Sequence, residues 1–176
     1  MSSAITIKTK PTIRRTSISF NKLTSIEIPS VLSIEEQNSD DPWSQLQFTT
    51  SIENSNNLCY CLSLNGKTIG YLIAMLAVDT ADILNIGINP DFKRQGYGTA
   101  LLNHLIEELR KRKIGEILLE VRAGNKSAIQ FYKKQGFEEI SVRKNYYTKN
   151  SKNKSQREDG IIMGLKIPST EINNDL

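Results

Sequence analysis

Short apolar stretches separated by polar turns run through the middle and the end of the chain, which is the pattern of β-strands in a sheet. The clearest turn is Asn65-Gly66, a strong signal for a two-residue hairpin. The isoleucines near the start of the chain show no helical period, so we expect a loose terminus that leads into a first strand. Further strands are predicted at 58–64, 68–78, 81–88, 116–122, 137–142 and 161–167.

Helical periodicity is strongest over 97–113, where the apolar residues form one stripe and the last turn is cationic, as the helix dipole prefers. The segment 22–37 also has a helical pattern, which Pro29 interrupts or starts. Ser44 is a candidate N-cap for a second short helix. A final helix is predicted at 125–135, before a glycine.

The order of these elements is a β-meander followed by β-α-β-α-β-β, which predicts an α+β fold with a mixed sheet. A chain of 176 residues favours a single domain. We expect this domain at 18–167, with a flexible extension at 1–17 and a flexible tail at 168–176. The stretch 149–155 is rich in Lys, Asn and Ser, and is typical of a solvated loop between the last two strands.

Composition narrows the classes of protein that fit. The formal net charge is +4 and the pI is about 9.0, a mild basic excess. No run of about 18 apolar residues occurs, which argues against a transmembrane helix and membrane association. Cys59 and Cys61 fall on one face of a predicted strand, which is poor geometry for a disulfide. Because His104 is the only histidine, we expect no metal site. The two unpaired cysteines are typical of a reduced protein of the cytoplasm.

A glycine-containing loop joins a predicted strand to the longest predicted helix, with the sequence Lys-Arg-Gln-Gly-Tyr-Gly-Thr at 93–99. Its glycines allow backbone N–H groups to converge on an anion, and the helix N-terminus adds free donors and partial positive charge. The spacing is neither that of a P-loop nor that of a Rossmann fingerprint. The loop therefore predicts a pyrophosphate site, and an ordinary glycine-rich turn into a helix is the alternative.

Two side chains are candidates for proton transfer. Glu120 interrupts the apolar run 117–121, where we expect a strand buried on both faces, so its carboxylate must be paired or lie in a cleft. The structural alternative is an ion pair between Glu120 and Arg122 on one strand face. Tyr132 follows Phe131 on the next helix, and its phenol could donate a proton to a leaving sulfur. The alternative for Tyr132 is a core aromatic.

The segment 85–102 resembles the acetyl-CoA-binding motif of the GNAT acetyltransferases, commonly Q/R-x-x-G-x-G/A. Lys93 takes the first position of that motif, which keeps the charge but loses the planar group. The resemblance implies acetyl-CoA as cosubstrate, with its pantetheine arm held by the backbone of Ile86, Gly87 and Ile88. It also implies that the pyrophosphate is held by Arg94, Gln95, Gly96, Tyr97, Gly98 and Thr99.

The segment 118–137 is similar, more specifically, to the RimI group of GNAT enzymes, the ribosomal-protein alanine N-acetyltransferases. The similarity extends over about 18–167 and includes the segments 42–44, 145–147 and 157–163. The resemblance implies the GNAT fold, in which about four helices flank a central mixed sheet. It also implies direct attack of the acceptor amine on acetyl-CoA in a ternary complex.

By the same resemblance, Glu120 matches the general base, Tyr132 the general acid and Asn125 a side chain that contacts CoA. The chain departs from the RimI group at Thr99, where those enzymes often carry arginine, in its basic start, and in a longer loop near 149–156. The first two departures leave the chemistry intact. The longer loop lies near the expected acceptor site and therefore bears on the range of substrates.

The acceptor implied by the RimI resemblance is the N-terminal alanine of small-subunit ribosomal protein eighteen, which starts with a basic segment. We expect a monomer or weak dimer that binds this protein terminus. Acidic residues precede Trp43, and we hypothesise that they attract the basic peptide; a solvated polar loop is the alternative. The predicted acceptor-binding residues are Glu35, Glu36, Asp40, Asp41, Trp43 and Tyr146.

Two other functions remain open at this point. A GNAT enzyme that acetylates a small amine, such as a polyamine or an aminoglycoside, would share the same CoA site. A non-enzymatic module could instead touch ribosomal RNA through the basic segment 144–154, where Tyr146 and Tyr147 could stack on bases. The sequence contains no RNA-recognition motif, which argues against direct RNA binding.

Overall fold

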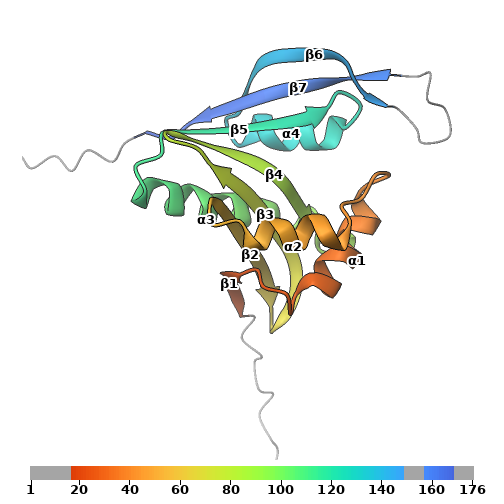
Figure 1. Cartoon of the computed structure of the whole chain (residues 1–176), viewed down its shortest axis with the longest axis vertical. Coiled ribbons are helices and arrows are strands. Elements are labelled where there is room, and N and C mark those ends of the chain that lie inside the picture. Colours follow the sequence, from red (N-terminus) through yellow and green to blue (C-terminus); the bar gives the residue numbers. More distant parts are fainter. Residues whose placement is uncertain (1–16, 149–156, 169–176) are drawn as a thin grey trace, which may run out of the picture.

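The structure is a computed structural model that describes residues 17–148 and 157–168. These residues form a seven-stranded sheet of order β1-β2-β3-β4-β5-β7-β6, with helices on both faces (Figure 1). The strands are β1 (Ile18–Lys22), β2 (Asn57–Leu64), β3 (Lys67–Leu76), β4 (Thr80–Ile88), β5 (Glu116–Arg122), β6 (Glu138–Thr148) and β7 (Arg157–Lys166). The helices are α1 (Ile28–Asn38), α2 (Gln45–Glu53), α3 (Tyr97–Lys111) and α4 (Lys126–Lys134), with a short 3-10 helix, η1 (Pro90–Phe92).

The predicted α+β fold with a mixed sheet is confirmed. Neighbouring strands are antiparallel except for β4 and β5, which are parallel. In the predicted hairpin, Asn65 has φ 50° and Gly66 has φ 82°, the two positive values that a type I′ turn requires. Ser44 caps α2 as expected, in a capping box with Gln47.

The largest difference from the predicted elements is β6, which continues to Thr148 instead of ending at Val142. Nearly every side chain of β6 is exposed because the strand lies at the edge of the sheet, so its sequence lacks the apolar alternation of a half-buried strand. The predicted loop at 149–155 lies outside the described residues. The predicted flexible segments 1–17 and 168–176 also lie outside them, apart from one residue of each.

Two clusters of buried side chains lie on opposite faces of the sheet. Along β3, Leu72 and Ala74 belong to a large cluster with α3 and α4, whereas Tyr71 and Ile73 belong to a smaller cluster with α1 and α2. The second cluster includes Cys61, and burial raises the pKa of that thiol. The buried stripe of α3 consists of Leu101, Leu102, Leu105 and Leu109. None of the helices in the described residues is long and apolar enough to cross a membrane.

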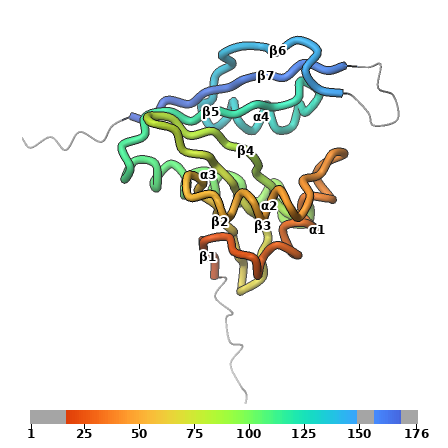
Figure 2. Tube along the Cα trace, in the orientation of Figure 1, coloured from red at the N-terminus to blue at the C-terminus, as the bar shows by residue number. Residues whose placement is uncertain are grey.

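Strands β4 and β5 are paired along only part of their length. Their parallel ladder covers Thr80–Ile83 of β4 and Glu116–Leu119 of β5. The register of β4 against β3 shifts at Leu84, which marks a β-bulge, and bulges bend a strand. Beyond this point β4 and β5 diverge (Figures 1 and 2). Because of this divergence, the last part of β4 and the end of β5 do not form hydrogen bonds with each other.

Candidate active site

The loop after β4 has the backbone shape of an anion-binding site. Asn89 caps η1 by accepting a hydrogen bond from the backbone N–H of Asp91 at 3.0 Å. The chain then passes through Arg94 at φ 61° and Gly96 at φ 87°, and α3 begins at the next residue. The N–H groups in the first turn of α3 have no partner within the helix, because helical hydrogen bonds begin only at Ala100, whose N–H donates to the carbonyl of Gly96 at 2.9 Å. These donors and the exposed Lys93 and Arg94 suit a pyrophosphate.

The two glycines of this loop have different reasons to be glycine. Gly96 needs a left-handed backbone, and no heavy atom lies within 4 Å of the place where its Cβ would be. Gly98 lies in α3, and its Cβ would be 3.5 Å from the ring of Phe131, an ordinary van der Waals contact. The backbone conformation therefore requires only the first glycine, whereas position 98 has room for a methyl group beside the ring of Phe131.

The end of β4 supplies the other predicted part of the cofactor site, Ile86, Gly87 and Ile88. On one side, these residues pair with β3 in the register Leu72–Ile86, Tyr71–Gly87 and Gly70–Ile88. The ring of Tyr71 passes so close to Gly87 that a Cβ there would lie 2.6 Å from it. On the other side they are beyond the ladder to β5. The carbonyl of Ile88 accepts a hydrogen bond from the side-chain amide of Asn38 at 3.0 Å, and the remaining unpaired backbone groups can bind an extended, amide-containing ligand.

Glu120 lies on β5 one residue beyond the last pair with β4, at the place where the two strands diverge. Its Oε2 accepts a hydrogen bond and ion pair from Arg143 at 2.8 Å. Its Oε1 is buried and has no hydrogen-bond partner among residues 17–148 and 157–168. A buried, unpaired carboxylate oxygen is costly, and a proton donor such as a water or an amine would satisfy it.

One expectation about Glu120, and the structural alternative weighed for it, were wrong. Strand β5 is buried on one face only, because buried and partly exposed residues alternate along it, and Glu120 is on the partly exposed face. The ion pair between Glu120 and Arg122 does not form. Arg122 instead donates to the carbonyl of Thr148 at 3.1 Å and to Asp41 at 3.4 Å.

Side chains of β6 complete the surroundings of Glu120. The guanidinium of Arg143 lies 3.4 Å from the ring centroid of Tyr146, and that of Arg122 lies 4.4 Å from the ring centroid of Tyr147. Burial, and then the neighbouring Glu120 carboxylate, raise the pKa of Tyr147. Of these side chains, only Tyr146 was predicted as an acceptor-side residue; Tyr147 was considered only for RNA stacking, and Arg143 was missed. The similar segment 145–147 could have indicated Tyr147, whereas Arg143 lies outside it.

Tyr132 lies on α4 and belongs to the large core cluster. Its side chain is 6% exposed and packs against the rings of Phe131 and Phe137, so the core placement weighed for it is correct. Burial raises the pKa of Tyr132, and the phenol therefore keeps its proton at neutral pH. Such a group can donate a proton but cannot act as a base.

Asn125 immediately precedes α4 and caps it. Its carboxamide oxygen accepts a hydrogen bond from the backbone N–H of Ala128 at 3.1 Å. Its amide nitrogen remains available to donate a hydrogen bond to a cofactor. The capping bond fixes the direction of that group, because it holds the carboxamide against the first turn of α4.

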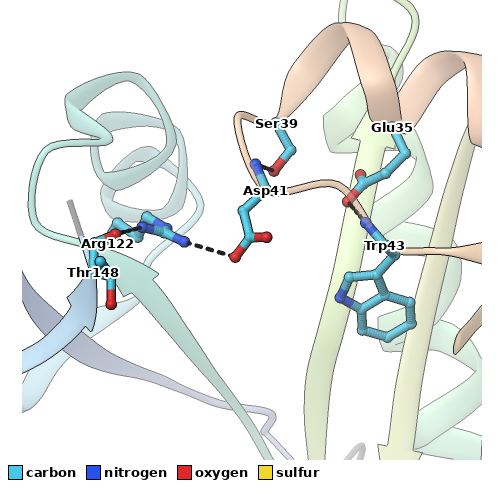
Figure 3. A network of polar contacts seen from close by, with 6 residues as sticks. All are labelled: Glu35, Ser39, Asp41, Trp43, Arg122 and Thr148. Atoms are coloured by element: carbon cyan, nitrogen blue, oxygen red, sulfur yellow. Dashed lines mark hydrogen bonds and ion pairs between the residues drawn. The ribbon is translucent and has the colours of Figure 1, made fainter. Parts of the chain in front are cut away.

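The predicted acidic cluster before Trp43 is split by the fold. Glu36, Asp40 and Asp41 are exposed, but Glu35 is 5% exposed and points into the interior. Its carboxylate accepts a hydrogen bond from the backbone N–H of Trp43 at 3.0 Å (Figure 3). It also accepts one from the hydroxyl of Tyr71. Glu35 is therefore removed from the surface cluster: it links α1 to β3 and to the loop that precedes α2.

One ion pair crosses from the α1–α2 loop to β5. Asp41 reaches Arg122 at 3.4 Å, and its own backbone N–H donates to Ser39 at 3.1 Å, which fixes the turn of the loop (Figure 3). This contact brings the acceptor-side loop near the end of β5 that carries Glu120. Within the described residues, no group of three or more His, Cys, Asp or Glu side chains could hold a metal ion.

Two bacterial acetyltransferases are similar to most of this chain. The ribosomal protein bS18-alanine N-acetyltransferase of Escherichia coli (strain K12) is 40% identical over 147 residues, 84% of this chain and 96% of the relative. The enzyme of the same name from Salmonella typhimurium (strain LT2) is 36% identical over 145 residues, 82% of this chain and 95% of the relative.

Solved structures show the same fold. The crystal structure of the ribosomal-protein-S18-alanine N-acetyltransferase from Escherichia coli has a TM-score of 0.78 and 38% identity, and the match covers 89% of this chain and 98% of that chain. Arabidopsis thaliana NAA60 in complex with a bisubstrate analogue has a TM-score of 0.75 at 16% identity, with 88% and 100% covered, which supports the fold alone. The profile of the Acetyltransferase (GNAT) family matches residues 28–137, and the chain belongs to this family.

Proposed function

We propose that this protein transfers the acetyl group of acetyl-CoA to the N-terminal alanine of ribosomal protein bS18, by direct attack in a ternary complex in the cytoplasm. The observation that carries the chemistry is the unpaired, buried Oε1 of Glu120 at the place where β4 and β5 diverge. The acceptor is inferred from the two bacterial relatives, at 40% and 36% identity, whose names state that substrate.

The described residues fit acetyl-CoA in two places. The first turn of α3, with Arg94 and Gly96 in left-handed conformations before it, offers converging donors to the pyrophosphate. The free edge of β4 at 86–88 offers backbone hydrogen bonds to the amides of the pantetheine arm. When bound, acetyl-CoA supplies a thioester, whose C–S bond breaks as the new N–C bond forms.

Two side chains move the protons of this exchange. Glu120 accepts a proton from the attacking amine through its free Oε1, directly or through one water. A free α-amine has a pKa near 7.7–8.0, so about one in ten is already neutral at pH 7 and a carboxylate is a sufficient base. Tyr132 donates its phenolic proton to the departing sulfur, since burial keeps that phenol protonated.

On the acceptor side, we assign the basic segment of the peptide to Glu36, Asp40 and Asp41, which are exposed beside Trp43. Asp41 already pairs with Arg122, so the other two carboxylates have more charge free for the peptide. Tyr146 on β6, which is 45% exposed, is the proposed aromatic contact of the peptide. Attraction between exposed charges is screened by salt, with a Debye length of about 10 Å at 0.1 M.

Acetyl-CoA turnover on a panel of acceptors tests this function. We expect acetylation of a peptide with the bS18 N-terminus, with a KM that rises as salt is added, because exposed carboxylates attract the peptide. The same peptide with a blocked α-amine should not react. Turnover of spermidine or kanamycin without turnover of the peptide would establish the small-amine alternative instead.

Gly96→Ala should raise the KM for acetyl-CoA about tenfold, because a left-handed backbone costs a residue with a side chain about 1–2 kcal/mol. Gly98→Ala is the matched control: it adds the same methyl group two residues later, in ordinary van der Waals contact with Phe131. We expect the control to change KM by less than about twofold. Steady-state kinetics and a thermal melt of both variants check this, and equal KM values would contradict the role assigned to the loop.

A further inference from the structure

Arg143 forms an ion pair with Glu120, and the proposed chemistry leaves this arginine without a role. It lies on the edge strand β6, 46% exposed, and its guanidinium donates to Oε2 of Glu120 at 2.8 Å. The ring of Tyr146 lies 3.4 Å from the same guanidinium. The arginine is therefore held between a carboxylate and an aromatic face, which fixes its position despite its exposure.

The ion pair occupies Oε2 of Glu120, and Oε1 is buried. An amine that binds to either oxygen of this carboxylate lies close to the fixed charge of Arg143. The hydrogen bond to Glu120 raises the pKa of Arg143, so the guanidinium stays charged over the whole working range of pH. The acceptor amine then binds beside a carboxylate whose negative charge is already compensated by Arg143.

We propose that Arg143 is a positioning residue that compensates the charge of Glu120 and so keeps the acceptor from being held as an unreactive ammonium ion. The inference rests on the proposed role of Glu120 as the base. An uncompensated carboxylate stabilises a neighbouring ammonium and raises the pKa of that amine. A nearby guanidinium opposes this effect, because like charges disfavour the protonated amine.

The other groups around the pair do not replace Arg143. Arg122 is on the same strand face as Glu120, but its guanidinium is committed to Asp41, to the carbonyl of Thr148 and to the ring of Tyr147. On the facing strand β7, Glu158 accepts a hydrogen bond from the backbone N–H of Gly124, and Asp159 pairs with Lys144 at 2.8 Å. The charged and titratable groups near the pair include Arg122, Asp41, Tyr146, Tyr147, Glu158, Lys144 and Asp159.

The test is the pH dependence of kcat and KM for the acceptor peptide in Arg143→Gln and Arg143→Lys. In Arg143→Gln, the pKa of the bound amine should rise by about one unit. This shift is at the low end of the range for a neighbouring charge, because the ion pair is partly exposed. We expect kcat at pH 7 to fall about tenfold and the KM for the peptide to fall as well, since the ammonium form now binds. The loss in kcat should disappear near pH 9.5, where the amine is neutral in both proteins, whereas Arg143→Lys should stay within about threefold of wild type.

Lys144→Gln is the matched control, since it removes the same charge from the next residue of β6. Lys144 pairs with Asp159 at 2.8 Å and not with Glu120, so its kinetics should match wild type. A loss in Arg143→Gln that is equal at every pH, or no loss, would overturn the inference. Glu120→Gln separates the two proposals: if it is inactive while Arg143→Gln shows no pH-dependent loss, only the role of Arg143 fails, and if it is fully active, the base assignment fails.

Discussion

Glu120→Gln should lower kcat for the acceptor peptide about a hundredfold at pH 7 and leave the KM for acetyl-CoA unchanged. The substitution keeps the shape of the side chain but removes its ability to accept a proton. The loss should shrink above about pH 8.5, because the free α-amine, with a pKa near 7.7–8.0, is then mostly neutral before it binds. The measurement is kcat across about pH 6.5 to 9.5, with substrates at saturation.

Glu116→Gln provides a closely matched control on the same strand. Glu116 is on the same face of β5 as Glu120, and the two side chains are 23% and 21% exposed. Each is ion-paired, Glu116 with Lys166 at 2.9 Å and Glu120 with Arg143 at 2.8 Å. At Glu116, however, β4 and β5 are still paired, so this carboxylate is not at the divergence. We expect wild-type kcat for the control, and an equal loss in both variants would refute the assignment.

Tyr132→Phe should also lower kcat about a hundredfold, because the sulfur then leaves without a proton from the enzyme. The ring keeps its packing against Phe131 and Phe137, so we expect the melting temperature to change by only a few degrees. The loss should be largest at low pH. A thiol with a pKa near 8.5, by analogy with cysteine, departs more readily as thiolate when the solution is alkaline.

Tyr60→Phe is the control for the loss of a buried phenol. Tyr60 is 8% exposed and Tyr132 6%, and both belong to the large core cluster, but Tyr60 lies on β2, away from the divergence. A decrease in kcat for Tyr132→Phe alone would support the proposed proton donor. Similar kinetics in both variants, or a kcat at the wild-type level for Tyr132→Phe, would leave Tyr132 with only its packing role.

The parts of the fold that depend on short sequence signals could be predicted. Asn65-Gly66 specifies its hairpin, Ser44 caps α2, and the apolar stripe of α3 faces the core, because each of these depends on residues close together in the chain. The glycine loop before α3 could be predicted for the same reason.

The surroundings of Glu120 could not be predicted in the same way. Its partner Arg143 is on β6, and the pairing of β6 with β7 is irregular between Arg143 and Tyr147, so no regular alternation indicates which side chains face β5. Glu35 shows the same limit. It follows the buried Ile34 on α1 and is itself buried, because donors outside α1, including the hydroxyl of Tyr71 and the backbone N–H of Trp43, satisfy its carboxylate.

The divergence of β4 and β5 also determines which mutations the proposed cofactor site tolerates. At 86–88 the ligand would be bound by the direction of the main chain, much as a neighbouring strand would be. Ile86 and Ile88 can therefore be exchanged for other residues that favour extended backbone, provided that the packing beneath them is preserved. Gly87 cannot be exchanged as freely, because the ring of Tyr71 fills the space of any side chain there. The site can thus be retained in proteins whose amino acids at these two flanking positions differ.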